Sequence, residues 1–210
     1  MLEVLFFLII LSIIILWVVW NYKNFIKIYT VQVFMIIAIF FIEYSDKFSQ
    51  DIFILISFIF AILIRWFLIP GFLYYFVKTS KLPLVEREFQ FGMFVNLIIY
   101  FIALWGISYI SIKVFGKYDY IFIASMFMVV SGFLNFANHK KLIWDILSFL
   151  ELENGIFLLS LLVLERISFY LELWIVADIM MSLAILLIST LKIRSVYWSI
   201  NIDKLASLKD

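Results

Sequence analysis

Acidic residues lie inside long apolar segments of this chain, where a charge is costly. Glu153 stands near the middle of the stretch Leu142–Leu164, and Asp178 lies within the next stretch, Leu171–Leu191. About 20 apolar residues form a helix long enough to cross a bilayer, and an ionisable group inside such a helix costs a few kcal/mol. Two successive segments with buried acids indicate proton or ion handling.

The stretch Leu142–Leu164 carries three acids, Asp145, Glu151 and Glu153. On a helix Glu151 and Glu153 point about 160° apart, so they are expected to face different neighbours, whereas Asp145 and Glu153 differ by about 80° and share a broad face. Asn154 and Gly155 add a polar group and a point of close approach beside Glu153. Glu153 is the deepest of the three acids. It either takes part in proton transfer or stays neutral and hydrogen-bonds a neighbour.

If the two segments are antiparallel helices, Asp178 and Glu153 lie at similar depths in the membrane. Counted from their shared end, the two residues differ by about four positions, or about 6 Å at 1.5 Å per residue. Glu172 lies at the start of the last segment, and it could instead be a surface acid. The same alternative applies to Asp145 and to His139.

Arg65 lies near the middle of the segment Ile52–Val77, five residues before Pro70. A guanidinium keeps its charge, so within a membrane it must reach water, a carbonyl or an acid. Pro70 removes a backbone hydrogen bond, and Pro70-Gly71 is a candidate kink. Arg65 is therefore either a structural link to a neighbouring helix or part of a charged axis. Asn96, Ser131 and Asn135 are expected to line a wet interior or to make polar helix contacts.

The composition explains why membrane segments must position these residues. Of 210 residues, 67% are hydrophobic, more than one water-excluded core of a soluble domain requires. The net charge of +1 argues against nucleic-acid binding. The chain has no cysteine, so thiolate zinc sites, iron–sulfur clusters and disulfides are excluded within it.

The hydropathy pattern predicts an all-α integral membrane protein with about seven transmembrane helices in one domain, residues 1–191, followed by a short cytoplasmic surface tail, residues 192–210. The first segment has no basic region before it and no cleavage site after it, so it is expected to be retained rather than removed as a signal peptide. The expected segments are about Leu2–Trp20, Ile28–Tyr44, Ile52–Val77, Phe91–Phe115, Tyr120–Phe136, Leu142–Leu164 and Leu171–Leu191.

Basic residues are distributed unevenly between the two predicted sides of the membrane. Eleven are in the first, third and fifth connections and the tail: Lys23, Lys27, Lys78, Lys81, Arg87, Lys140, Lys141, Lys192, Arg194, Lys204 and Lys209. Four are on the other side: Lys47, Lys113, Lys117 and Arg166. Because basic loops stay in the cytoplasm, the N-terminus is predicted outside and the C-terminus inside.

Four short motifs in order resemble the hydrogenase-4 component E family, membrane subunits of group 4 [NiFe] hydrogenase and formate hydrogenlyase complexes. They are Arg65-Trp66-Phe67-Leu68-Ile69-Pro70, Leu152-Glu153-Asn154-Gly155, the pair Glu172 and Asp178 at six-residue spacing, and the ending Leu205-Ala206-Ser207-Leu208-Lys209. This chain has Arg65 where the family carries lysine, which keeps the charge but not a titratable proton. The last two helices are also similar to subunit K of complex I, with Asp178 at the second of its two membrane glutamate positions.

The resemblance implies a subunit without its own catalytic site in a prokaryotic plasma membrane. Its partners would be antiporter-like and quinone-module-like membrane subunits and, through them, hydrophilic hydrogenase subunits that hold the [NiFe] centre and iron–sulfur clusters. No cofactor is expected in this chain. The predicted pathway residues are Glu153, Asp178, Arg65, Glu151, Asp145 and Glu172.

Two other functions fit the same sequence. The chain could be a purely structural subunit whose acids make satisfied interhelical contacts. It could also be an independent secondary transporter, which predicts inverted repeats and paired broken helices; Pro70-Gly71 has no counterpart in the second half. No nucleophile, metal cluster or cofactor motif favours a membrane enzyme acting alone.

Overall fold

The computed structural model describes residues 2–18, 21–49, 52–79, 93–117, 119–138 and 142–163. In this part of the chain the regular structure is helical: α1 (Leu2–Val18), α2 (Tyr22–Tyr44), a 3-10 turn η1 (Ser45–Lys47), α3 (Ile52–Phe60), a π-helical segment η2 (Ala61–Leu68), α4 (Ile69–Thr79), α5 (Met93–Phe115), α6 (Tyr120–Asn138) and α7 (Leu142–Val163). Since α3, η2 and α4 follow one another without a break, they form one long helical rod.

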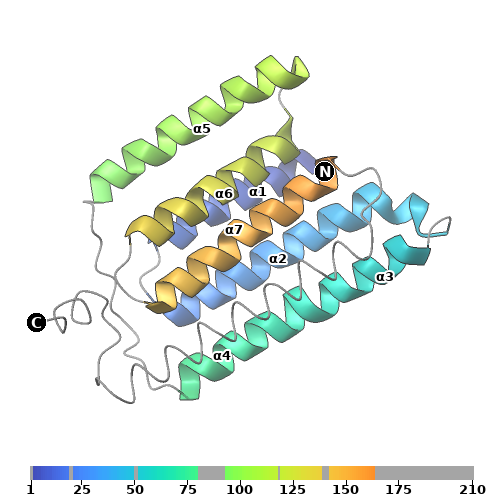
Figure 1. The fold of residues 1–210 in the computed structure, drawn as a ribbon, viewed down its shortest axis with the longest axis horizontal. Helices are drawn as coiled ribbons and strands as arrows, with labels where there is room; N and C mark the ends of the chain where they lie inside the picture. The colour runs from blue at the N-terminus through green and yellow to red at the C-terminus, as the bar shows by residue number, and fades with distance from the viewer. Residues whose placement is uncertain are drawn as a thin grey trace, which may run out of the picture.

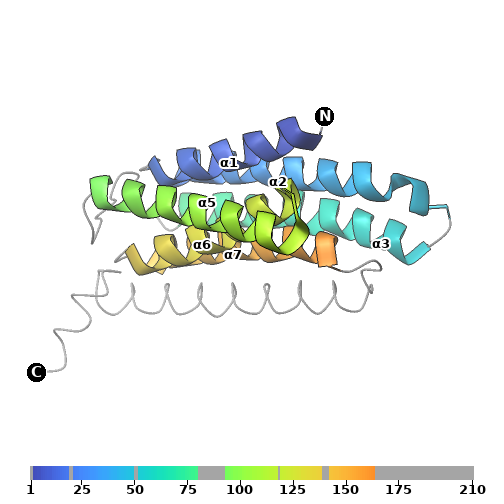
Figure 2. The ribbon, with the colours of Figure 1, turned by 90° about the horizontal axis from the view of Figure 1, so that it is seen from above.

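The helices run side by side along the long axis of the molecule, and successive rods alternate in direction (Figure 1). α6 and α7 are the most closely packed pair, α1 packs on α2 and α6, and α2 also contacts η2, α4 and α7. α5 lies at one edge of the bundle and packs mainly on α6 (Figures 1 and 2). α2 therefore occupies the centre and α7 lies between α2 and α6, where a buried polar group can meet several helices.

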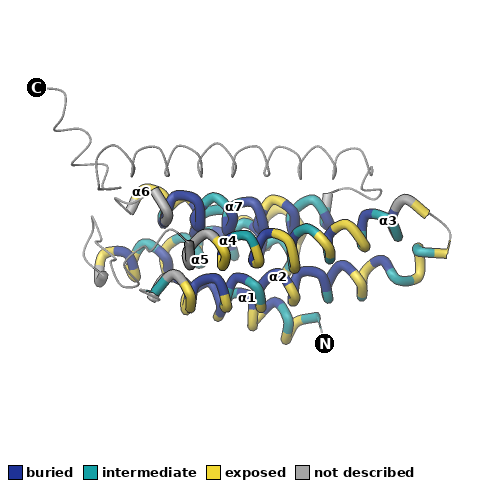
Figure 3. The backbone as a smooth tube through the Cα atoms, turned by 90° about the horizontal axis from the view of Figure 1, so that it is seen from below, coloured by how far each residue is buried: buried dark blue, intermediate teal, exposed yellow. Residues whose placement is uncertain are grey.

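Large apolar side chains cover the outside of the bundle. Phe7, Phe101 and Trp105 are 66%, 64% and 74% exposed, and buried residues gather on the inward sides of the helices (Figure 3). Four helical stretches are long and apolar enough to cross a membrane: Lys23–Lys47, Ile54–Tyr75, Val95–Phe115 and Tyr120–Ala137. An apolar exterior on helices of this length is the character of a membrane protein.

Six of the seven predicted segments are helices in the described ranges. α1 is apolar but shorter than the four candidate spans, and α7 carries the three acids discussed above. The predicted segment Leu171–Leu191 and the tail 192–210 lie outside the described residues. The second segment starts earlier than predicted: residues 22–27 were assigned to a polar connection, but they are helical. Asn21 caps the helix there by accepting a hydrogen bond from the Lys23 backbone N–H at 2.9 Å.

The predicted connection between α5 and α6 is confirmed, and two residues define it. Gly116 adopts φ of 69°, the left-handed conformation that commonly ends a helix, and its N–H bonds the Ile112 carbonyl at 2.9 Å. Asp119 then caps α6 by accepting a bond from the Phe122 N–H at 2.9 Å. This tight turn makes α5 and α6 antiparallel neighbours.

Two glycines allow α6 and α7 to approach closely. A Cβ atom at Gly132 would lie 2.6 Å from the Leu152 Cβ, and one at Gly155 would lie 2.8 Å from the Ser125 carbonyl oxygen. Small residues at such contacts let helix backbones pack directly, which is a principal source of helix association in membranes. The close approach also fixes the register of α6 against α7, with residue 132 opposite residue 152.

Replacing Gly155 or Gly132 by alanine should push α6 and α7 apart and destabilise the protein by about 1–3 kcal/mol, the usual cost of overpacking. The measurement is the thermal unfolding midpoint of the purified protein in detergent. Gly106→Ala is the matched control, because nothing lies within 4 Å of a Cβ atom at that helical position. Equal midpoints for the three variants would contradict the close contact.

Candidate functional site

The π-helical segment η2 presents Arg65 to the interior of the bundle. The backbone N–H of Ile69 bonds the carbonyl of Ile64, five residues earlier, instead of the usual four. The ring of Pro70, the next residue, would collide with a carbonyl four residues back in a regular α-helix, and the wider turn before it relieves that collision. Arg65 is 2% exposed, so this departure from α-helical geometry coincides with the buried charge. Such single wide turns often occur at functional sites.

Arg65 reaches Glu153 of α7. Its Nη2 lies 3.3 Å from the Glu153 Oε1, and both side chains are buried. The Arg65 guanidinium carbon also lies 4.2 Å from the centre of the Phe157 ring, one turn further along α7. The Glu153 carboxylate and the face of the Phe157 ring thus both stabilise the positive charge, as a guanidinium inside a membrane requires. The expectation that Arg65 must reach an acid, a carbonyl or water is met by Glu153.

Glu151 faces the opposite side of α7 and meets α6. The Ser131 hydroxyl donates to its Oε1 at 2.7 Å, and the Asn135 amide donates to its Oε2 at 2.8 Å. The two glutamates therefore have different neighbours, as their angular separation predicts. Ser131 and Asn135, expected to line a wet interior or to make polar helix contacts, contact Glu151 directly.

Tyr100 of α5 extends this cluster. Its hydroxyl lies 3.1 Å from the Ser131 hydroxyl oxygen and 3.4 Å from the Asn135 Oδ1, and its single proton can be donated to either of them. Because the Ser131 hydroxyl donates to Glu151, its oxygen can accept the Tyr100 proton, and when it does the two hydroxyl groups form a chain of donors that ends at the carboxylate. Tyr100 carries no clear signal in the sequence, since a tyrosine in an apolar segment is common and its partners lie on another helix.

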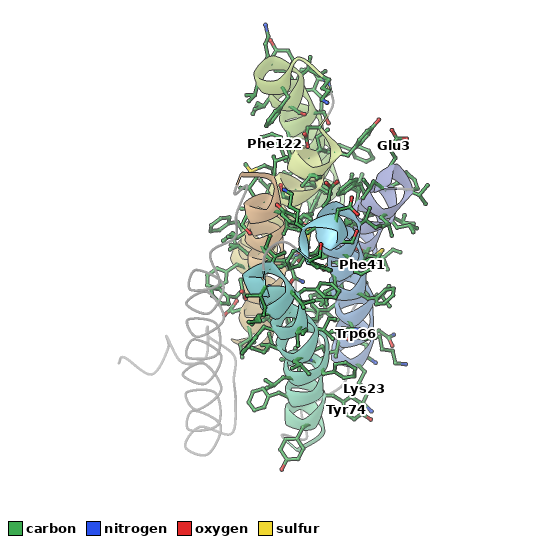
Figure 4. All side chains as sticks on the ribbon, turned by 90° about the vertical axis from the view of Figure 1, so that its right-hand side faces the viewer. Glu3, Lys23, Phe41, Trp66, Tyr74 and Phe122 are labelled. Atoms are coloured by element: carbon green, nitrogen blue, oxygen red, sulfur yellow. The ribbon has the colours of Figure 1, made fainter. Side chains whose placement is uncertain are left out.

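Together these contacts form one polar layer across the bundle, defined here as Arg65, Glu153, Glu151, Ser131, Asn135 and Tyr100. The layer runs from η2 through α7 and α6 to α5. Its members lie at one depth, because Gly132 packs against Leu152 and so brings Ser131 beside the two glutamates. α2 and the two glycine contacts hold the helices around it. Figure 4 draws the side chains of the described residues, and Trp66 of η2 lies beside α2, where its ring contacts Phe34.

Two buried polar side chains of α2 carry no prediction from the sequence, and one of them, Tyr29, lies beside the Arg65 end of the layer. The Tyr29 hydroxyl of α2 lies close to Asn154 and within electrostatic range of Arg65 and Glu153. Gln32 of α2 is fully buried. Gln32 could have been noticed in the sequence, because a glutamine in the middle of an apolar span is unusual.

The remaining predicted site residues are not part of this layer in the described structure. Asp145 is buried in the first turn of α7, about 12 Å along the helix from Glu153, where an acid is favoured by the helix dipole. Glu172, Asp178 and His139 lie outside the described residues. Asn96 is buried in α5, one turn before Tyr100. Within the described ranges, no group of three or more His, Asp or Glu side chains is placed to hold a metal ion.

No protein-family model, curated protein or solved structure matches this chain. The site is therefore interpreted from its own geometry.

Removing either partner of the Arg65–Glu153 pair should be strongly destabilising, by about 3–5 kcal/mol, because it leaves one buried charge without its counterion. The double variant Arg65→Met with Glu153→Leu should recover much of that loss. The measurement is a double-mutant cycle on the thermal unfolding of the purified protein.

Lys113→Met, which removes a cation beside Tyr109 near the end of α5, is the control for charge removal and should change the midpoint little. Strictly additive losses in the double variant would contradict the ion pair.

Proposed function

We propose that this chain is a non-catalytic subunit of the membrane arm of a group 4 [NiFe] hydrogenase-type complex. Its buried acids contribute to a proton or sodium translocation axis that is coupled to hydrogen or formate redox chemistry. The chain lies in a prokaryotic plasma membrane, with its N-terminus outside and its C-terminus in the cytoplasm. The proposal rests on the resemblance of its motifs and on the chemistry of the polar layer.

The observation that carries the proposal is the ratio of acids to cations in the layer. Two carboxyl groups, Glu151 and Glu153, share the layer with one guanidinium among the described residues. With both acids ionised these three groups by themselves would carry a net negative charge in surroundings of low polarity, which is costly. A proton or a small cation on one acid removes that cost, so the layer favours binding one exchangeable positive charge.

The orientation of the layer supports transfer along the membrane plane. Its polar groups extend from η2 to α5, at both sides of α7, rather than from one membrane face to the other. Tyr100 and Ser131 supply hydroxyl groups that can pass a proton by reorienting their hydrogen bonds. A lateral row of this kind fits a subunit that is flanked by others. Antiporter-like and quinone-module-like subunits would continue the row on either side.

The remaining pathway residues extend the proposal. Asp178 is assigned to the axis by its depth relative to Glu153, and Glu172 and Asp145, which the sequence places nearer the membrane surfaces, remain predicted members of the same pathway. Redox groups belong to partner subunits, since the chain has no cysteine to hold a cluster.

A purely structural role is the second candidate, and a specific observation favours it. Both deep acids have partners within the chain: Arg65 for Glu153, and Ser131 and Asn135 for Glu151. Satisfied contacts of this kind would join helices without moving any ion. The two candidates differ in what happens when an acid is neutralised.

Glu151→Gln should lower ion translocation several-fold, because an amide cannot bind and release the transferred proton. Glu153→Gln should do the same, but it also removes the charge partner of Arg65, so its translocation is compared per assembled complex. Hydrogen oxidation or evolution by the detergent-solubilised complex should largely survive. The measurement compares proton and sodium uptake into membrane vesicles with hydrogenase activity, for each variant. Asp178→Asn is expected to behave in the same way.

Glu43→Gln is the matched control, since it makes the same change at an exposed glutamate at the end of α2. Translocation should be unchanged in that variant. If both buried-acid variants also translocate normally while the complex assembles, the ion-axis function is wrong and the structural role replaces it.

A further inference from the structure

Four buried polar side chains surround one contact between α6 and α7, and each of them touches two of the others. They are Tyr100, Ser131, Glu151 and Asn135, called here the Glu151 cluster. The Ser131 and Asn135 donors lie 2.7 Å and 2.8 Å from the two carboxylate oxygens of Glu151. The Tyr100 hydroxyl lies 3.1 Å from the Ser131 hydroxyl oxygen and 3.4 Å from the Asn135 Oδ1. The cluster is therefore a closed cycle of four contacts.

With Glu151 ionised, the hydrogen bonds of this cycle do not all run in one direction. Ser131 and Asn135 both donate to the carboxylate, one to each oxygen. Tyr100 has a single proton, which it gives either to Ser131 or to Asn135. One of the two contacts of Tyr100 therefore contains no proton in this state.

A proton on the Glu151 Oε2 would complete the cycle. The Asn135 amide turns over, so that its Oδ1 accepts from the new O–H and its Nδ2 donates to the Tyr100 oxygen. Tyr100 then donates to Ser131, and Ser131 still donates to the Glu151 Oε1. Each of the four contacts now contains one proton, and hydrogen bonds that follow one another in this way strengthen each other.

A sodium ion fits this place poorly. It donates no hydrogen bond to Asn135, and it needs several oxygens at about 2.3–2.6 Å, the range for calcium, an ion of similar size. Oxygens that share a metal ion have no hydrogen bond between them, so those of Ser131 and Glu151 would have to move apart from 2.7 Å. Gly132 and Gly155 oppose this movement, because Cβ atoms there would lie only 2.6 Å and 2.8 Å from atoms of the facing helix. The two helices are packed for a proton.

We propose that Glu151 takes a proton and excludes sodium, and that Asn135 determines this choice by turning its amide over when the proton arrives. Its two orientations match the ionised and the protonated acid in turn. The role of this site in transport rests on the proposed function, since the inference names the ion that Glu151 carries. The other charged groups of the polar layer, Arg65 and Glu153, meet on the opposite face of α7.

Infrared difference spectra of the purified full-length protein, recorded between acidic and alkaline buffer, test the proton. The wild type should show a carboxylic acid C=O band that is absent in Glu151→Gln. In Asn135→Leu this band should move to higher frequency, because the acid loses the acceptor of its proton. Tyr100→Phe should give a smaller shift in the same direction. Ser125→Ala is the control and should leave the band in place, since this buried α6 hydroxyl bonds the Phe122 carbonyl of its own helix.

The unfolding midpoints in sodium chloride and in choline chloride of equal ionic strength test the exclusion of sodium. The two midpoints should agree for the wild type. A higher midpoint in sodium that disappears in Glu151→Gln would overturn the inference, because a bound ion stabilises the folded protein by mass action. Spectra without a band that depends on Glu151 would overturn it as well. So would a band that stays in place in Asn135→Leu and Tyr100→Phe, or in Tyr100→Phe alone if the leucine variant does not fold.

Neither readout measures ion transport or requires partner subunits, so the proton site and the proposed function fail separately. A band that depends on Glu151, together with normal translocation by the Glu151→Gln complex, would refute the proposed role of this acid and leave the proton site intact. Stabilisation by sodium would do the reverse: it would overturn the proton site and leave a sodium axis in place.

Discussion

The permanent charge of Arg65 inside an apolar bundle is the constraint on which the rest of the structure depends. A guanidinium cannot be neutralised by losing a proton, so the helices must bring it an acid and a polarisable surface. Glu153 and Phe157, one turn apart on α7, supply these at 3.3 Å and 4.2 Å. The π-helical segment before Pro70 belongs to the same arrangement, since it relieves the proline and places Arg65 at the depth of Glu153.

α7 separates two different electrostatic environments. Glu153 meets a charge, whereas Glu151 meets neutral donors on α6 that themselves contact Tyr100. This division requires α6 to lie directly against α7, and Gly132 and Gly155 allow it. The same close contact brings Ser131 to the depth of the glutamates. Backbone packing and the polar layer are therefore linked: a change that separates the two helices also breaks the layer that the proposed function requires.

Much of this arrangement could be predicted from the sequence. The lengths of the apolar segments predicted the helices. Because Arg65 cannot lose its proton, the sequence also predicted that it needs a partner such as an acid. The 100° helical step predicted that Glu151 and Glu153 face different neighbours. The partner of Arg65 could not be predicted, because the register between helices depends on contacts such as Gly132 with Leu152. Tyr100 and Tyr29 were missed for the same reason. The early start of α2 was missed because Lys23, Asn24 and Lys27 indicate a polar connection until the cap at Asn21 is known. The predicted role of Asp178 concerns residues outside the described ranges.

The measurement that tests the central claim most directly is a gentle affinity purification of the tagged chain from its native membranes, followed by identification of the bound proteins and a hydrogenase assay. The account predicts co-purification with a [NiFe] large subunit and antiporter-like membrane proteins, with hydrogenase activity in the recovered complex. Recovery of the chain alone, or as a homo-oligomer without such activity, would contradict it and would favour an independent transporter.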